Sequence, residues 1–283
     1  MYMVIKMKKN ISIVSNLQYI AKKLIERFNA HSISAYGTQM AFFLMLSFFP
    51  FLIFLFTILG RLSINTDLLM QVLQVFFPKS VHKLAFDFIN NYILVKDNSV
   101  ISVSIIGTLW SASKGVRGLM VSLNKAYEIN ETRNFFVIKI IDMLYTVLIA
   151  FGIVILLALP NIGVDLYNFI NKYIEVKWEI FTLYNRIKII ILPLTLILIM
   201  SLIYMYAPNI KQKPRDVIWG TLFSIFGWSM LSYFFTIFLN NFSNYKLVYG
   251  SLATVIVLML WLYFASMILI IGGEINSILK KNE

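Results

Sequence analysis

Two cations beside a run of small residues form the most unusual stretch of this sequence. Lys114 and Arg117 are three positions apart and are therefore neighbours on a helix. Gly107, Ser111 and Gly115 recur every four residues through the same stretch, a small-residue pattern that lets membrane helices approach closely. Two adjacent cations at headgroup depth could hold a phosphate or another anion, with arginine offering bidentate geometry. The alternative is a helix end whose cations snorkel to the interface.

An acid near the end of the chain is the second candidate for chemistry. Glu274 follows a long apolar run and the pair Gly272 and Gly273. A carboxylate at a helix C-terminus opposes the helix macrodipole, so we expect Glu274 to have a charge partner. Lys114 or Arg117 is the predicted partner, because all three are expected at the same cytoplasmic depth. The alternative is a solvated carboxylate.

Other positions point to helix shape and packing. Pro50 lies well inside an apolar run, where it removes a helical hydrogen bond and predicts a kink or a broken helix. Ser47, one turn earlier, could bond the freed backbone. This site is either a hinge or cavity wall, or a tolerated kink. Gly220, Ser224 and Gly227 share one helical face, which predicts close helix packing.

Three more side chains at membrane depth have simpler interpretations. Asp142 stands near the start of an apolar stretch, where Lys139 could pair with it. Tyr204 and Tyr206, with the tryptophans, are expected in the aromatic belt at the membrane interface rather than in a stacking platform.

Enzyme machinery is missing from the sequence. It has no cysteine and two histidines, His31 and His82, which leaves little for a metal site. No phosphate-binding loop, zinc-protease motif or nucleophile elbow is present, and the 13 acidic residues are scattered. We therefore predict no catalytic residue, no cofactor and no metal ligand, and a protein that is not an enzyme.

The elements that must position these residues are membrane spans. Apolar residues make up 59% of the 283 residues and charged residues 13%. A helix needs about 20 residues to cross about 30 Å of hydrocarbon, and the apolar runs lack the alternation of barrel strands. We predict an all-α, polytopic membrane bundle of six transmembrane helices with amphipathic interfacial helices. The spans are expected at about 35–59, 99–118, 136–160, 187–207, 217–239 and 249–273, the second being the weakest.

The domain organisation follows from these spans. Residues 1–34 are predicted to be a cytoplasmic, basic, amphipathic segment with a helix over 13–28 that lies on the membrane surface. Residues 35–276 form the membrane domain, and 277–283 a short cytoplasmic tail. The outer loop 61–99 is expected to hold two amphipathic helices broken at Pro78.

Charge placement predicts the orientation. The net charge is +12, and most of the 25 Lys and Arg residues lie in segments that would share one side of a six-span protein. The positive-inside rule places both termini in the cytoplasm. Contact with anionic membrane lipids explains the basic charge better than nucleic-acid binding. The expected partners are membrane lipids and an anionic or amphiphilic substrate, with no nucleic acid. The sequence leaves homo-oligomer formation open.

Several motifs together resemble the YihY/BrkB family of inner-membrane proteins, once labelled ribonuclease BN. The resemblance runs from Ala35 to Asn276, and its motifs agree in order and spacing. They are Tyr36 with Ser47-Phe48-Phe49-Pro50, Leu109-Trp110-Ser111-Ala112-Ser113-Lys114-Gly115, Leu123-Asn124-Lys125-Ala126-Tyr127, Arg133, Tyr206-Ala207-Pro208, Trp219-Gly220, Trp228, Tyr249-Gly250-Ser251-Leu252, Trp261-Leu262-Tyr263 and Gly272-Gly273-Glu274-Ile275-Asn276.

This resemblance implies a six-span inner-membrane protein of the cell envelope, with export of a lipid or other solute as the expected role. The nuclease label brings no catalytic residues that match this sequence. The leading hypothesis is a transporter or exporter of a lipid or other amphiphile. A membrane scaffold that organises envelope proteins is the alternative, and a membrane-associated ribonuclease ranks last.

Overall fold

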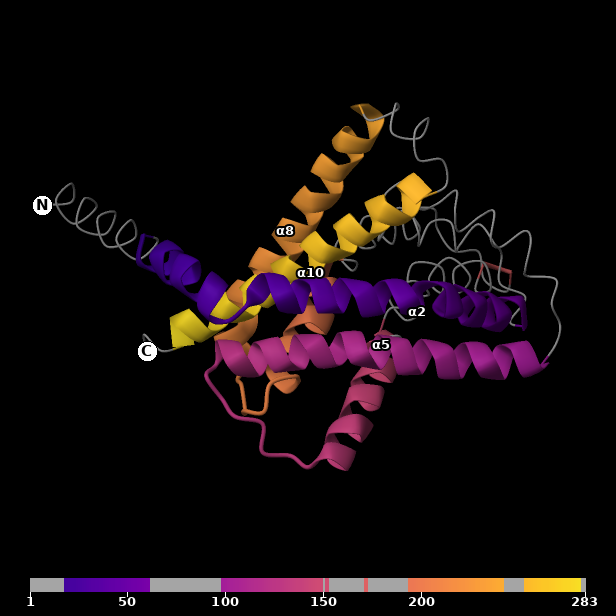
Figure 1. Cartoon of the computed structure of the whole chain (residues 1–283), viewed down its shortest axis with the longest axis horizontal. Helices are drawn as coiled ribbons and strands as arrows, with labels where there is room; N and C mark the ends of the chain where they lie inside the picture. The colour runs from indigo at the N-terminus through magenta and orange to yellow at the C-terminus, as the bar shows by residue number, and fades with distance from the viewer. Residues whose placement is uncertain are drawn as a thin grey trace, which may run out of the picture.

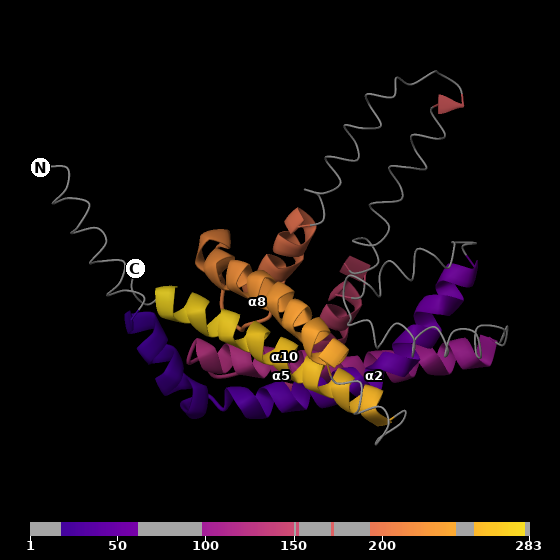
Figure 2. The same cartoon turned by 90° about the horizontal axis from the view of Figure 1, so that it is seen from above.

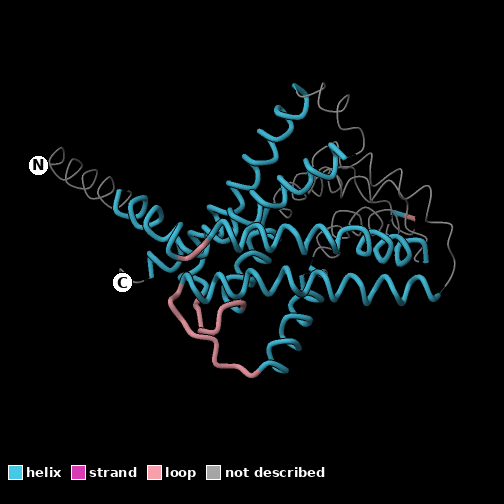
Figure 3. Tube along the Cα trace, in the orientation of Figure 1, coloured by secondary structure: helices cyan, strands magenta, loops and turns pink. Residues whose placement is uncertain are grey.

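A computed structural model describes residues 18–61, 98–149, 151–152, 171–172, 193–241 and 252–280. Every secondary-structure element in these ranges is a helix (Figure 3). The four long ones are α2 (Ile33–Arg61), α5 (Asn98–Ala126), α8 (Pro214–Asn241) and α10 (Leu252–Lys280). Shorter helices cover 18–30, 135–149 and Pro193–Tyr206. The all-α prediction is confirmed for the described part of the chain.

Two helices in these ranges are long and apolar enough to cross a membrane. They are Pro214–Phe238 and Val255–Lys280, and Ile33–Phe48 and Pro193–Tyr206 are shorter apolar helices. The count of six spans therefore stays a prediction. The two amphipathic helices expected around Pro78 lie outside the described residues, as do the start of the N-terminal helix and the end of the third predicted span.

The helix ends differ from the predicted ones where packing extends the helix. The predicted second span ends at 118, but α5 continues to Ala126. The last helix, α10, continues to Lys280, so the predicted boundary between membrane domain and tail at 276/277 falls inside a helix. Ser277 and Ile278 are buried there, and this burial accounts for the extra turn.

Helices α2 and α5 lie side by side along the long axis of the molecule (Figure 1). Gly107 and Gly115 of α5 face α2, where a Cβ atom would meet Pro50 at 3.7 Å and Leu44 at 3.4 Å. Helix α2 continues through Pro50 without a break, and its axis turns between its first half and its end (Figure 2). Ser47 donates to the carbonyl of Leu44 at 2.9 Å, not to the carbonyl of Leu46 that the proline leaves unpaired.

Helix α10 packs against α8 through the predicted small residues. A Cβ atom on Gly220 would overlap the Gly272 carbonyl and the Asn276 side chain, so only glycine fits there. The Gly220 N–H donates to Asn276 Oδ1 at 2.6 Å. Gly227 lies against Ile268, where a Cβ atom would be 2.9 Å from Cγ2. The two helices therefore approach each other closely along this face.

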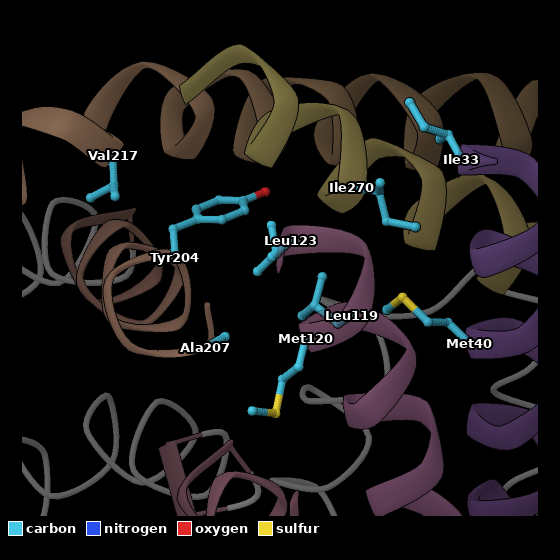
Figure 4. Packing of buried hydrophobic residues seen from close by; sticks show 9 residues of the cluster. All are labelled: Ile33, Met40, Leu119, Met120, Leu123, Tyr204, Ala207, Val217 and Ile270. Carbon is cyan, nitrogen blue, oxygen red and sulfur yellow. The ribbon is translucent and has the colours of Figure 1, made fainter. Parts of the chain in front are cut away.

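The core of the bundle surrounds the second half of α5. Leu119, Met120 and Leu123 pack with residues of α2, α8, α10 and the helix Pro193–Tyr206 (Figure 4). Tyr204 is fully buried, and its hydroxyl lies 2.6 Å from Ser224 Oγ and donates to the Leu269 carbonyl at 2.7 Å. The expectation that Tyr204 belongs to an interfacial belt is wrong, because two hydrogen bonds satisfy its hydroxyl inside the core.

Large apolar side chains cover the outside of the bundle. On α8, Phe226, Tyr233 and Phe234 are each more than half exposed, and Trp110 and Ile106 project from α5 in the same way. A protein surrounded by water rarely exposes apolar surface along several helices. This surface is suited to lipid.

Candidate functional site at the end of α5

Glu274 of α10 is fully buried, and both of its carboxylate oxygens are paired. Arg27 Nη1 donates to Oε2 at 3.1 Å, and His31 Nδ1 lies 2.5 Å from Oε1. The same Arg27 nitrogen also donates to Ser277 Oγ at 3.2 Å. We call these four residues the Glu274 cluster. Since every charged oxygen in it has a partner, the cluster joins the helix 18–30 to α10 as a satisfied ion-pair network.

The end of α5 completes the Glu274 cluster. The carbonyl of Ala126, the last residue of α5, accepts hydrogen bonds from Arg27 at 3.3 Å and from Ser277 at 2.6 Å. Arg27 Nη2 also pairs with Glu128 at 3.0 Å. Glu128 has a left-handed backbone with φ of 56°, which ends the helix. The terminal carbonyl of α5 is thereby held against the arginine, the favourable arrangement for a cation at a helix C-terminus.

A second group of charges lies beside the first. Arg133 holds Glu131 through two hydrogen bonds of 2.6 and 2.7 Å, and Asn124 Nδ2 donates to Glu131 at 3.2 Å. Arg117 Nη1 lies 3.3 Å from Glu131 and 3.9 Å from Asp142. We call these five residues the Asp142 cluster. It brings together α5, the segment after it and the helix 135–149.

The pKa values of Glu131 and Arg133, in the segment after α5, are shifted from their usual values. The hydrogen bonds from Arg133, with a smaller contribution from Arg117, lower the pKa of Glu131 to about 2. The same contact with Glu131 raises the pKa of Arg133 above its usual value. Glu131 is thus a firmly ionised partner for both arginines at neutral pH.

The structure corrects two predicted ion pairs. Glu274 does not pair with Lys114 or Arg117, because Arg27 of the helix 18–30 and His31 of the turn after it pair with both of its oxygens. Asp142 faces Arg117 of α5, whereas Lys139 lies over the Phe135 ring, 5.9 Å from its centroid. Both errors have one cause: partners that come from other helices leave no pattern in the local sequence.

Lys114 has an aromatic environment. Its ammonium lies 3.7 Å from the centroid of the Trp110 ring and 5.1 Å from that of Phe43. Among the described residues no carboxylate lies within 4.0 Å of it, whereas Arg117 one turn later has two acids beside it. Within the described ranges, Lys114 is therefore the member of the predicted anion-binding pair that has no acidic partner.

An apolar groove of about 380 Å³ runs beneath the helix 18–30. It is lined by Leu24, Ile25, Phe28, Asn29, Ile33 and Ile271. Ile25 is 74% exposed, so the groove opens to the surroundings of the protein. Metal binding has no equivalent site: no group of three or more His, Cys, Asp or Glu side chains comes together in the described ranges.

The sequence patterns do not single out Arg27, His31 or Glu131 as site residues. Arg27 falls inside the amphipathic helix predicted over 13–28, and His31 follows it as one of only two histidines. Their spacing of four residues puts both on one face, next to Leu24 and Phe28, and this was the available signal. Charged side chains that border the apolar stripe of a short helix are candidates for burial at its docking site.

Comparison with known proteins gives a match over almost the whole chain. The family described as virulence factor BrkB matches residues 24–283. The putative ribonuclease-like protein YfkH of Bacillus subtilis is 32% identical over 262 residues, covering 93% of this chain and 95% of the relative.

More distant relatives carry a membrane-protein name. A UPF0761 membrane protein of Alteromonas mediterranea is 24% identical over 88% of this chain and 84% of its own length. One from Coxiella burnetii is 21% identical over 90% of this chain and 91% of its own length. No solved structure matches the chain.

Proposed function

Because the chain belongs to the BrkB family, which includes UPF0761 membrane proteins, we propose that it is a multi-pass protein of the bacterial cytoplasmic membrane that transports or exports a lipid or other amphiphile. Both termini lie in the cytoplasm in this proposal. Lys114 contacts the anionic headgroup, and the protein is not an enzyme.

The position of Lys114 is the observation that carries the proposal. Its ammonium has aromatic rings as neighbours and no carboxylate among the described residues, so an anion can approach it. Trp110 beside it is 54% exposed, as expected for a residue at the membrane interface. The apolar groove under the helix 18–30 supports an amphiphilic ligand, since its lining suits hydrocarbon rather than a polar solute.

The helix packing supports movement along the seam between α2 and α5. Gly107 of α5 lies against Pro50 of α2 in this seam. The axis of α2 turns between its first half and its end (Figure 2).

The test is transbilayer movement of fluorescent phosphatidylglycerol in proteoliposomes, with phosphatidylcholine as the zwitterionic arm. Lys114→Gln is compared with Lys125→Gln, a matched lysine of α5 that lies over the Tyr36 ring. We expect movement of phosphatidylglycerol to fall with Lys114→Gln and to stay unchanged with Lys125→Gln.

Movement that is absent, or equal in all three proteins, overturns the headgroup role of Lys114. Absent movement with correct folding favours the scaffold alternative. Metal-dependent RNA cleavage by the purified protein, abolished by neutralising its acids, would instead support the ribonuclease-like name of the Bacillus subtilis relative.

A further inference from the structure

Asp142 is a fully buried carboxylate whose oxygens lack hydrogen bonds from the described part of the chain. Its exposure is 0%, and neither Oδ1 nor Oδ2 has a hydrogen-bond partner there. Thr146, one turn later, donates to the backbone carbonyl of Asp142 and not to its side chain. An acidic side chain within a predicted span is a functional residue by default, because the bilayer makes its charge costly.

The charges that face Asp142 leave it only weakly paired. Arg117 of α5 lies 3.9 Å from Oδ1, beyond hydrogen-bond length, and is nearer to Glu131 at 3.3 Å. In the connecting segment, Arg133 is bonded to Glu131.

The titratable groups on the helices packed around Asp142 are engaged elsewhere. On its own helix, Lys139 lies over Phe135, and the Tyr145 hydroxyl donates to the carbonyl of Tyr206. On the helix Pro193–Tyr206, the Tyr204 hydroxyl bonds to Ser224 and Leu269. An ionised carboxylate here would thus be buried without a donor, which costs several kcal/mol, whereas a neutral carboxylic acid avoids most of that cost.

Arg117 can serve either of two acids. Glu131 does not depend on it, since Arg133 and Asn124 already bond both of its oxygens. A small movement of the guanidinium towards Asp142 would form the hydrogen-bonded ion pair that is lacking now. The geometry therefore permits a second arrangement, in which Arg117 bonds to Asp142 rather than to Glu131.

We infer that Asp142 is a proton-binding residue whose protonation is exchanged against pairing with Arg117. A water-derived proton bonds to an Asp142 oxygen when Arg117 stays with Glu131, and it leaves to water when Arg117 turns to Asp142. A proton fits better than a metal ion, because no further acid or histidine joins Asp142 to make a group of three in the described ranges. This inference rests on the proposed function, to which it adds a proton gradient as the energy source.

The direct test is pH-difference infrared spectroscopy of the whole protein in lipid, which detects the carbonyl stretch of a protonated carboxyl group. We expect a band in the wild type that is lost in Asp142→Asn. Asp216→Asn is the matched control, because Asp216 pairs with Lys280 at the start of α8. The band should remain in this control. A band that persists in Asp142→Asn, or none in the wild type at any pH, overturns the inference.

Two further variants test the exchange. Glu131→Gln frees Arg117 for Asp142, so the Asp142 band should disappear at a pH about one unit lower than in the wild type. Arg117→Gln should raise the pH at which the band disappears. Unchanged titration in both variants contradicts the exchange.

Lipid movement under an imposed pH gradient separates this inference from the proposed function. Phosphatidylglycerol movement should respond to the gradient in the wild type and not in Asp142→Asn. If lipid moves at the same rate with and without the pH gradient, and the Asp142 band is absent, lipid transport is supported and the proton-binding inference is contradicted. If the Asp142 band is present but no lipid moves, the proton-binding site is supported and the proposed transport of lipid is contradicted.

Discussion

Glu274 and Asp142 are both carboxylates with 0% exposure, and they lie at the same end of the bundle, but their partners differ. Glu274 has an arginine and a histidine within hydrogen-bond distance of its two oxygens. Asp142 has one arginine at 3.9 Å, which another acid shares. A buried charge whose oxygens are all paired stabilises the packing of the helices, whereas a buried acid with incomplete pairing can take up a proton.

The largest effect expected from this comparison concerns the arginines. Arg27→Ala leaves Glu274 buried with only His31, and breaking a buried ion pair in this way costs about 3–5 kcal/mol. Arg117→Ala should cost about 1 kcal/mol, because Glu131 keeps Arg133 and Asp142 loses only a distant contact. Denaturant unfolding in detergent measures both.

Lys23→Ala is the control for the arginine variants. It removes an exposed pair with Glu26 on the same short helix, and stability should not change. Equal losses for Arg27→Ala and Arg117→Ala would remove the distinction between the two clusters.

The next effect tests the close helix approach that places Glu274. Gly220→Ala puts a methyl group onto the Gly272 carbonyl, and overpacking of this kind costs about 1–3 kcal/mol. Gly107→Ala is the matched change, since its new methyl group would lie 3.7 Å from Pro50 at ordinary contact distance. We expect the thermal unfolding temperature to fall clearly in Gly220→Ala and only slightly in Gly107→Ala. A tolerated Gly220→Ala would contradict the fit of α8 against α10.

The pH dependence of stability tests whether Glu131 acts as an ionised partner of Arg133. Arg133 lowers the pKa of Glu131 to about 2, so its ionised form stabilises the fold above its ordinary pKa near 4.5. That contribution is lost as the pH falls from 4.5 towards 2. Glu131→Gln should therefore be less stable than the wild type at neutral pH, and the difference should vanish in acid. A difference that is constant with pH would show that Glu131 is not the anchoring charge.

The smallest effect concerns the turn that aims Arg27 and His31 at Glu274. Ser32 has a left-handed backbone with φ of 55°, a conformation that costs about 1 kcal/mol for residues other than glycine. Ser32→Gly should raise the free energy of unfolding by somewhat less than that amount, because glycine relieves the strain but gives the unfolded chain more freedom. Ser34→Gly, at the second residue of α2, should lower it instead, because it also removes the hydrogen bond between the Ser34 and Tyr263 hydroxyls. A loss of stability in Ser32→Gly would mean that the serine side chain is needed there.

Local patterns in the sequence predicted most of the helices but not the charge pairs. Apolar runs gave the positions of α2 and α8 within a few residues, and small-residue spacing placed Gly220 and Gly227 in a helix contact. These features depend on periodicity within one segment. The partners of Glu274 lie more than 240 positions away in the chain, and no local pattern encodes such a distance. The left-handed turn at Ser32, which directs them there, has no glycine to mark it.

The most direct test of the contrast between the two acids is the unfolding free energy of Glu274→Gln beside that of Asp142→Asn at neutral pH. The account predicts a loss of about 3–5 kcal/mol for Glu274→Gln, because the largely buried Arg27 keeps only the exposed Glu128 as a counter-charge. It predicts a change within about 1 kcal/mol for Asp142→Asn, because a neutral amide replaces a carboxyl group that is already neutral. A loss in Asp142→Asn as large as that in Glu274→Gln would show that Asp142 is an ionised structural partner of Arg117, and would contradict the account.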